Sequence, residues 1–113
     1  MHELSIAQNI LDIVNEELLS NNLSKATKVT VRVGRLAGIE PASLRFCFEI
    51  LTRDTKAEGS ALEIDYVPVR FRCHACQIDF ALDRWDFICP ECMGNRLEIT
   101  SGRELQVVEL EAY

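Results

Sequence analysis

The chain has 113 residues, of which 48% are hydrophobic and 27% are charged, a composition typical of one small globular domain with or without an appendage. Twelve basic residues against eighteen acidic ones give a net charge of -6, which argues against a partner bound through phosphate contacts, so we expect no nucleic acid. No apolar run approaches the roughly 18 residues of a membrane span and the start lacks a secretory leader, which predicts a cytoplasmic protein.

The first predicted element is an amphipathic helix over residues 4–19. Its apolar residues recur three and four positions apart, and they are Leu4, Ala7, Leu11, Val14 and Leu18. Ser5 and Gln8 match a capping box, and Asn21 and Asn22 mark the end of the helix.

A strand, a helix and a second strand are predicted next. Residues 28–33 and 62–66 alternate polar and apolar side chains, which is typical of strands. Pro41 suits the first turn of a second helix, on whose apolar stripe Cys47 is expected to be a small buried thiol. A strand, helix and strand in this order form a crossover unit, so the two strands should be parallel with the helix on one face.

A last strand is predicted over residues 105–110, and it has too little apolar surface to stand alone. We therefore expect this strand to pair with the first sheet. The expected fold class is α+β, with a small three-stranded mixed sheet, two helices and an inserted zinc-ribbon domain. The expected domains are residues 1–69, completed by the C-terminal strand 103–113, and an inserted ribbon over residues 70–102.

Four of the five cysteines form two matched pairs, Cys73-x2-Cys76 and Cys89-x2-Cys92, separated by twelve residues. This spacing is typical of a zinc ribbon, in which two turns each offer two thiolates to a tetrahedral ion. Four protein ligands leave no open position for water or substrate, so we predict a structural Zn(II). A segment this small lacks a sufficient core, and zinc binding can supply on the order of 10 kcal/mol of folding free energy.

Other interpretations of this segment remain open at this point. A single reactive CxxC would indicate a thiol oxidoreductase, and many zinc ribbons bind nucleic acid as adaptors. Between Cys73 and Cys92 four residues are acidic and one is basic, which disfavours the nucleic-acid alternative. His74 is either a spare ligand or a surface residue. The residues expected to form a hairpin over the metal are Phe80, Leu82, Trp85 and Phe87.

Several motifs together carry a resemblance to a known family. They are His2-Glu3-Leu4-Ser5, Val33-Gly34, Phe46-Cys47-Phe48-Glu49, Cys89-Pro90-Glu91-Cys92 and Glu104-Leu105-Gln106-Val107. With them the whole chain resembles the HypA/HybF family of hydrogenase maturation proteins. The resemblance implies a metallochaperone that delivers Ni(II) as cargo to the large subunit of [NiFe]-hydrogenase, with the GTPase HypB as partner and UreE as a further partner where urease is served. It also implies separate nickel and zinc domains. The sequence contains no Ser/His/Asp set, phosphate-binding glycine-rich loop or histidine-rich cluster, so we expect no enzymatic activity.

The first residues offer a set of donors suited to nickel. A bulky second residue favours retention of Met1, whose α-amine, with the His2 imidazole and the backbone nitrogens of His2 and Glu3, can form fused chelate rings. Such a nearly planar nitrogen set favours Ni(II) or Cu(II) over tetrahedral Zn(II). Glu3 and, less directly, Glu40 are candidates to support this site. The alternative is a disordered His2 and a first-turn acid favoured by the helix dipole. Some relatives have a histidine where this chain has Met93, so a histidine-dependent response of the zinc site to pH is not expected.

Overall fold

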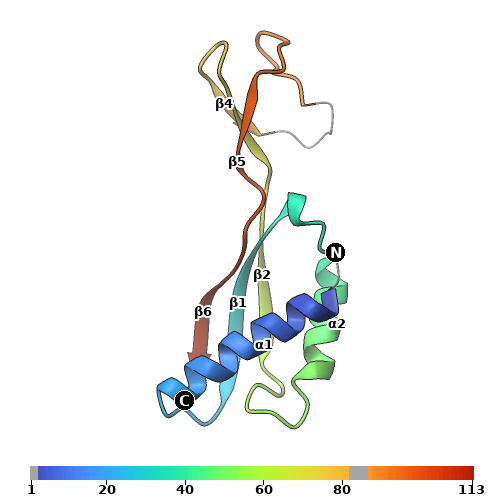
Figure 1. Ribbon diagram of the computed structural model, residues 1–113. Helices are drawn as coiled ribbons and strands as arrows, with labels where there is room; N and C mark the ends of the chain where they lie inside the picture. Colours follow the sequence, from blue (N-terminus) through green and yellow to red (C-terminus); the bar gives the residue numbers. More distant parts are fainter. Residues whose placement is uncertain (1–2, 82–86) are drawn as a thin grey trace.

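The computed structural model describes residues 3–81 and 87–113. Within these ranges two three-stranded sheets lie at the two ends of an elongated molecule measuring 54 × 25 × 16 Å (Figure 1). Two helices accompany the sheet that holds the C-terminus, and the other sheet stands apart from them (Figure 1). None of the described helices is long and apolar enough to cross a membrane.

The larger sheet has the strand order β2-β1-β6, with β1 (Ala26–Gly34) in the centre, β2 (Ala61–Val67) on one side and β6 (Leu105–Ala112) on the other. β1 and β2 are parallel, and β1 and β6 are antiparallel. The predicted crossover and the predicted return of the last strand are therefore both confirmed. β-Branched residues dominate the buried positions of β1, as expected for a central strand covered by helices.

Two helices, α1 (Glu3–Ser20) and α2 (Pro41–Leu51), cover one face of this sheet (Figure 1). Burial of one aliphatic or aromatic core side chain contributes roughly 1.5–3 kcal/mol. Leu44 and Phe48 bury the inner face of α2, while Cys47, expected to be buried, is half-buried and packs against the same core. The core residues that α1 contributes are Ile6, Ala7, Ile10, Leu11, Val14 and Leu18.

The first helix ends where the sequence predicted, at a pair of asparagines. Asn22 takes a left-handed conformation with φ of 54°, which asparagine tolerates better than most residues. The N–H of Leu23 donates to the carbonyl of Leu18 at 2.9 Å, and the N–H of Asn22 donates to that of Leu19 at 3.3 Å. These two bonds form a Schellman motif, which satisfies carbonyl groups that the helix leaves free.

The smaller sheet is antiparallel, with β3 (Arg70–Cys73) between β4 (Asp79–Ala81) and β5 (Leu97–Ser101). β3 and β5 were not predicted. Phe71 is only 2% exposed, and its ring lies 5.7 Å from that of Phe80 and 5.3 Å from that of Phe87. This aromatic cluster is the small apolar centre of the ribbon. Of the residues expected to pack over the metal, Leu82 and Trp85 lie outside the described residues.

The junction between the two sheets is held by close backbone contacts. The N–H of Gly34, at the end of β1, donates to the carbonyl of Glu104 at 2.7 Å. The N–H of Leu36, in the 3₁₀ helix η1 (Arg35–Ala37), donates to the carbonyl of Gly102 at 2.7 Å. A Cβ at residue 34 would overlap the Gly102 carbonyl, so only glycine allows this approach. The segment that returns from the ribbon is thus fixed to the end of β1.

Candidate metal-binding sites

The two cysteine pairs lie on two turns with the same hydrogen-bond pattern. In the first turn, the N–H of Cys73 donates to the carbonyl of Ile78 and the N–H of Gln77 donates to that of Cys73, both at 2.9 Å. In the second turn, the N–H of Cys89 donates to the carbonyl of Gly94 and the N–H of Met93 donates to that of Cys89, again both at 2.9 Å. The two turns therefore have the same backbone hydrogen-bond structure.

The residue that follows each cysteine pair adopts the left-handed backbone conformation and closes the turn. Gln77 has φ of 62° and Met93 has φ of 59°, although neither is glycine. This conformation costs about 1–2 kcal/mol for a residue with a side chain. A folded site that holds both turns can offset that cost.

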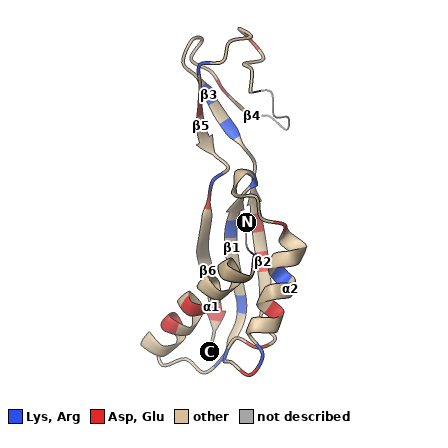
Figure 2. Ribbon diagram, turned by 45° about the vertical axis from the view of Figure 1, so that its right-hand side comes forward, with Lys and Arg blue, Asp and Glu red and all other residues tan. Residues whose placement is uncertain are grey.

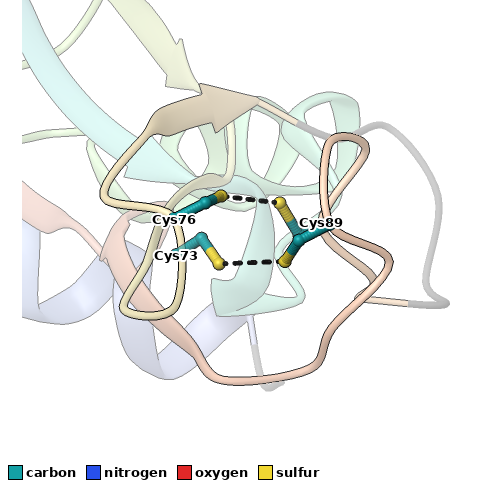
Figure 3. A group of neighbouring side chains, drawn as sticks. Cys73, Cys76 and Cys89 are labelled. Carbon is teal, nitrogen blue, oxygen red and sulfur yellow. Dashed lines mark hydrogen bonds between the residues drawn. The ribbon is translucent and has the colours of Figure 1, made fainter.

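The four sulfur atoms converge on one point. All four lie within 4.8 Å of one another, with 3.7 Å between Cys73 and Cys92 and 3.5 Å between Cys76 and Cys89. Figure 3 shows the side chains of Cys73, Cys76 and Cys89 turned toward each other. With zinc–sulfur bonds of about 2.3 Å, a regular tetrahedron has sulfur–sulfur edges of about 3.8 Å. The observed spacing fits one shared ion and greatly exceeds the roughly 2.05 Å of a disulfide bond.

The thiols of this group differ in how readily they ionise. The backbone N–H groups of Cys76 and Ala75 are directed at the sulfur of Cys73 and lower the pKa of Cys73 to about 6. Burial and the neighbouring sulfur atoms raise the pKa of Cys76 to about 12. Four crowded thiolates repel one another, so the group becomes fully ionised only when a metal ion compensates the charge.

His74 and Met93, which lie beside the cysteines in the sequence, are both exposed. His74 is exposed, and its Nε2 atom lies 3.2 Å from a carboxylate oxygen of Glu98 rather than among the sulfur atoms. Met93 is 71% exposed. In this structure His74 is therefore a surface residue that has its own partner.

A second group of candidate residues lies where the two helices begin. The N–H of Glu40 donates to Oε1 of Glu3 at 3.3 Å, which joins residues 37 positions apart in the sequence. The carboxylate of Glu40 caps α2 by accepting the N–H of Ser43 at 2.7 Å, and Pro41 occupies the first turn. Met1 and His2, the other expected nickel ligands, lie outside the described residues.

Both carboxyl groups of this pair favour their charged form. The N–H of Glu3 itself and then that of Glu40 lower the pKa of the Glu3 carboxyl group. The N–H groups of Ser43 and Ala42 lower the pKa of Glu40. Glu3 and Glu40 therefore bring two ionised carboxyl groups to the starts of the two helices, with the Glu40 N–H donating to the Glu3 carboxylate.

Sequence reasoning assigned Glu3 and Glu40 to the same expected nickel site but did not predict the hydrogen bond between them. It also missed Phe71, the buried centre of the ribbon. The signal for Phe71 was its place two residues before Cys73 in a short alternating run, Arg70-Phe71-Arg72-Cys73.

A helix-covered sheet joined to a ribbon with four converging cysteines defines the chain as a small metal-binding protein. A sequence model described as "Hydrogenase/urease nickel incorporation, metallochaperone, hypA" matches residues 1–112. The hydrogenase maturation factor HypA of Azotobacter vinelandii is 42% identical over 111 residues, covering 98% of both chains. The factor HybF of Klebsiella pneumoniae is 39% identical with the same coverage. The chain therefore belongs to the HypA family of metallochaperones, which are maturation factors and not enzymes.

Solved structures agree with this fold. The solution structure of the Ni metallochaperone HypA from Helicobacter pylori has a TM-score of 0.68 at 24% identity, covering 99% of this chain and 97% of that one. Another solution structure of a HypA protein has a TM-score of 0.74 at 23% identity, covering 100% and 97%. At these identities the likeness concerns the fold alone.

Proposed function

We propose that this protein binds one Ni(II) ion at its N-terminus and delivers it to the large subunit of a [NiFe]-hydrogenase. The ligands are the α-amine of Met1, the imidazole of His2, and backbone nitrogens of His2 and Glu3. The contact between Glu3 and Glu40 carries the proposal, because it brings a second acidic residue, Glu40, to the residue that directly follows His2. Membership of the family supports nickel as the cargo.

The proposed site selects its metal by geometry. A nearly planar set of nitrogen donors suits Ni(II), whereas the four thiolates of the ribbon suit tetrahedral Zn(II). Glu40 acts here in two ways. Its N–H orients the Glu3 carboxylate, while its own carboxylate is engaged by Ser43 and adds negative charge without direct coordination.

We propose a structural role for zinc in the ribbon. Cys73, Cys76, Cys89 and Cys92 would hold the ion as four thiolates, which leaves no position for a substrate. The ion would fix two turns around the small aromatic cluster. The domain division follows from this proposal: residues 1–69 with 103–113 form the nickel domain, and residues 70–102 form the zinc domain.

The partners proposed are the GTPase HypB and the hydrogenase large subunit, with UreE added if urease is served. Because the net charge is -6, surface charge should guide these encounters. Binding measured by pull-down should therefore weaken as salt is raised from about 0.05 M to about 0.5 M. Pull-down that responds to neither salt nor nickel would contradict this part of the proposal.

Calorimetry with Ni(II) tests the N-terminal site on three proteins: the untagged chain, a chain with a short N-terminal extension, and His2→Ala. The extension turns the α-amine into an amide and removes one basic donor, and His2→Ala removes the imidazole. Both should lower nickel affinity at least roughly tenfold and leave zinc content at one ion per chain. Equal nickel affinity in all three proteins would reject the site.

A matched pair of substitutions separates the helix-capping role of the Glu40 side chain from the effect of its charge on nickel binding. Serine is a good helix cap and alanine is a poor one, and neither carries a charge. Glu40→Ser should keep the stability of α2 and weaken nickel binding, whereas Glu40→Ala should reduce both. If Glu40→Ser binds nickel like the unmodified protein, the carboxylate of Glu40 plays no part in the site.

Metal analysis of the untagged protein compares this proposal with the other functions considered. One zinc ion together with about one nickel ion on titration is the expected result. Zinc without nickel would favour a zinc-ribbon adaptor or nucleic-acid-binding module. Cysteines without metal would favour a thiol oxidoreductase.

A further inference from the structure

β6 forms an edge of the larger sheet that the helices leave open. The strand order β2-β1-β6 pairs β6 with β1 on one side only. In register with β1, Leu105 pairs with Val33 and Val107 with Val31, so both point to the helix-covered face. Leu105 is nevertheless 43% exposed. An edge strand with free backbone groups and exposed apolar side chains is a template for pairing with another strand.

A groove of about 160 Å³ runs between this edge and α1. Its floor is the buried core residues Ile6 and Ile10, which are 5% and 4% exposed. Its rims are Leu105 on β6 and Ile13 on α1, the latter 44% exposed. A cavity of about 150 Å³ accommodates a benzene ring, so this groove has room for an aliphatic side chain from a partner.

The surroundings of the groove are acidic. α1 carries four acidic residues and no lysine or arginine (Figure 2). Glu16 and Glu17 follow Ile13 at helical spacing and continue the side of α1 that borders the groove. β6 also contains acidic residues, Glu109 and Glu111, and no basic one.

The basic residues of the neighbouring strand form their ion pairs with β2, on the side away from β6. Lys28 of β1 pairs with Glu63 of β2 at 3.6 Å, and Arg32 pairs with Asp65 at 3.2 Å. Among the described residues, the carboxylates of β6 form no ion pair. The open edge therefore combines an apolar groove with carboxylates that form no ion pair within the described part of the chain.

We propose that this edge binds an extended segment of a partner protein in which apolar and basic residues alternate. The segment would pair with β6 as an added strand, insert an apolar side chain between Ile13 and Leu105, and place basic side chains near Glu109 and Glu111. A second copy of this chain fits less well, because pairing of two β6 strands brings like charges together. A register shift next to Val107 also interrupts the strand, which limits long self-pairing.

The inference goes beyond the nickel site, and its test does not depend on nickel. The probe is a short peptide of alternating lysine and valine with blocked ends, titrated into the full-length, zinc-loaded protein and followed by amide NMR. Two control peptides have the same composition in blocks, or glutamate in place of lysine. Saturable binding should shift the amides of Leu105–Ala112 and Ile13 and slow hydrogen exchange along β6.

A matched pair of variants locates the contact. Ile13→Ser removes a rim of the groove, and Leu19→Ser makes a similar change on the same helix at a residue that is 74% exposed. Ile13→Ser should weaken peptide binding roughly tenfold, while Leu19→Ser should stay within about twofold. His2→Ala should bind the peptide normally, so failure of the nickel proposal would leave this one standing.

Four outcomes would overturn the proposal. Equal binding of the alternating and block peptides would show an unspecific charge effect, and shifts away from β6 and α1 would place the contact elsewhere. Equal affinity of the Ile13→Ser and Leu19→Ser variants would exclude the groove. A dimer measured by light scattering, with β6 amides protected before peptide is added, would identify a second copy as the occupant.

Discussion

Replacing Gly34 by alanine should destabilise the junction between the two sheets, although the backbone conformation at residue 34 is one that alanine readily adopts. The backbone of Gly34 has φ of -79° and ψ of 149°, which alanine adopts without strain. The new methyl group would nevertheless overlap the Gly102 carbonyl and lie 2.5 Å from the backbone nitrogen of Arg103. Because these neighbours are backbone atoms, no change of rotamer relieves the overlap.

The expected loss in the free energy of unfolding follows from the backbone contacts that must separate. Two backbone hydrogen bonds, from Gly34 to Glu104 and from Leu36 to Gly102, contribute about 1 kcal/mol each. Overpacking adds about 2 kcal/mol, and the reduced entropy of the unfolded chain returns about 0.7 kcal/mol. Gly34→Ala should therefore lower the free energy of unfolding by about 3 kcal/mol. For a chain of this size that corresponds to a fall in Tm of roughly 12 °C.

Urea unfolding followed by circular dichroism at the helix band measures this change. The matched control is Gly38→Ala, where φ is 68° and no atom lies within 4 Å of the added Cβ. That substitution brings backbone strain of about 1 kcal/mol and no overlap. An unfolding midpoint for Gly34→Ala at or above that of Gly38→Ala would show that the close approach of the two glycines does not stabilise the fold.

Three further predictions concern the zinc site, the core and acid. Replacing Cys76 and Cys92 together by alanine should abolish stoichiometric zinc while the helical signal persists; global loss of helix would show that the two sheets do not fold independently. Phe48→Ala should cost about 3–5 kcal/mol because Phe48 is 2% exposed, and Phe46→Ala, at 63% exposure, should cost far less; equal urea midpoints would contradict this. The pKa of Glu40 is lowered by folding, so its contribution to stability is present above the unfolded value of 4.5 and is lost as pH falls through the folded value. Urea midpoints measured from about pH 6 to about pH 3 should therefore fall less steeply in Glu40→Ser, and identical slopes would argue against the charged cap.

The elements that sequence reasoning predicted depend on local patterns. The spacing of apolar residues along α1 and α2 repeats every three or four positions, and this periodicity is a property of the segment itself. The pairs Cys73-x2-Cys76 and Cys89-x2-Cys92 likewise specify their turns locally, and the structure brings their sulfur atoms together. β3 and β5 were missed because they are only four and five residues long. Runs this short carry too few alternating positions to distinguish a strand from a loop.

Only the tertiary structure decided which distant residues meet. Glu3 contacts Glu40 because α1 and α2 begin at the same end of the sheet, and nothing in the sequence near either residue specifies that approach. The glycine contact at the junction and the open groove beside β6 arise in the same way, from where packed elements come to lie. The physical reason is that hydrophobic burial is non-directional and is summed over the whole core. Packing of the core therefore fixes distant parts of the chain together, and their contacts cannot be predicted from one segment at a time.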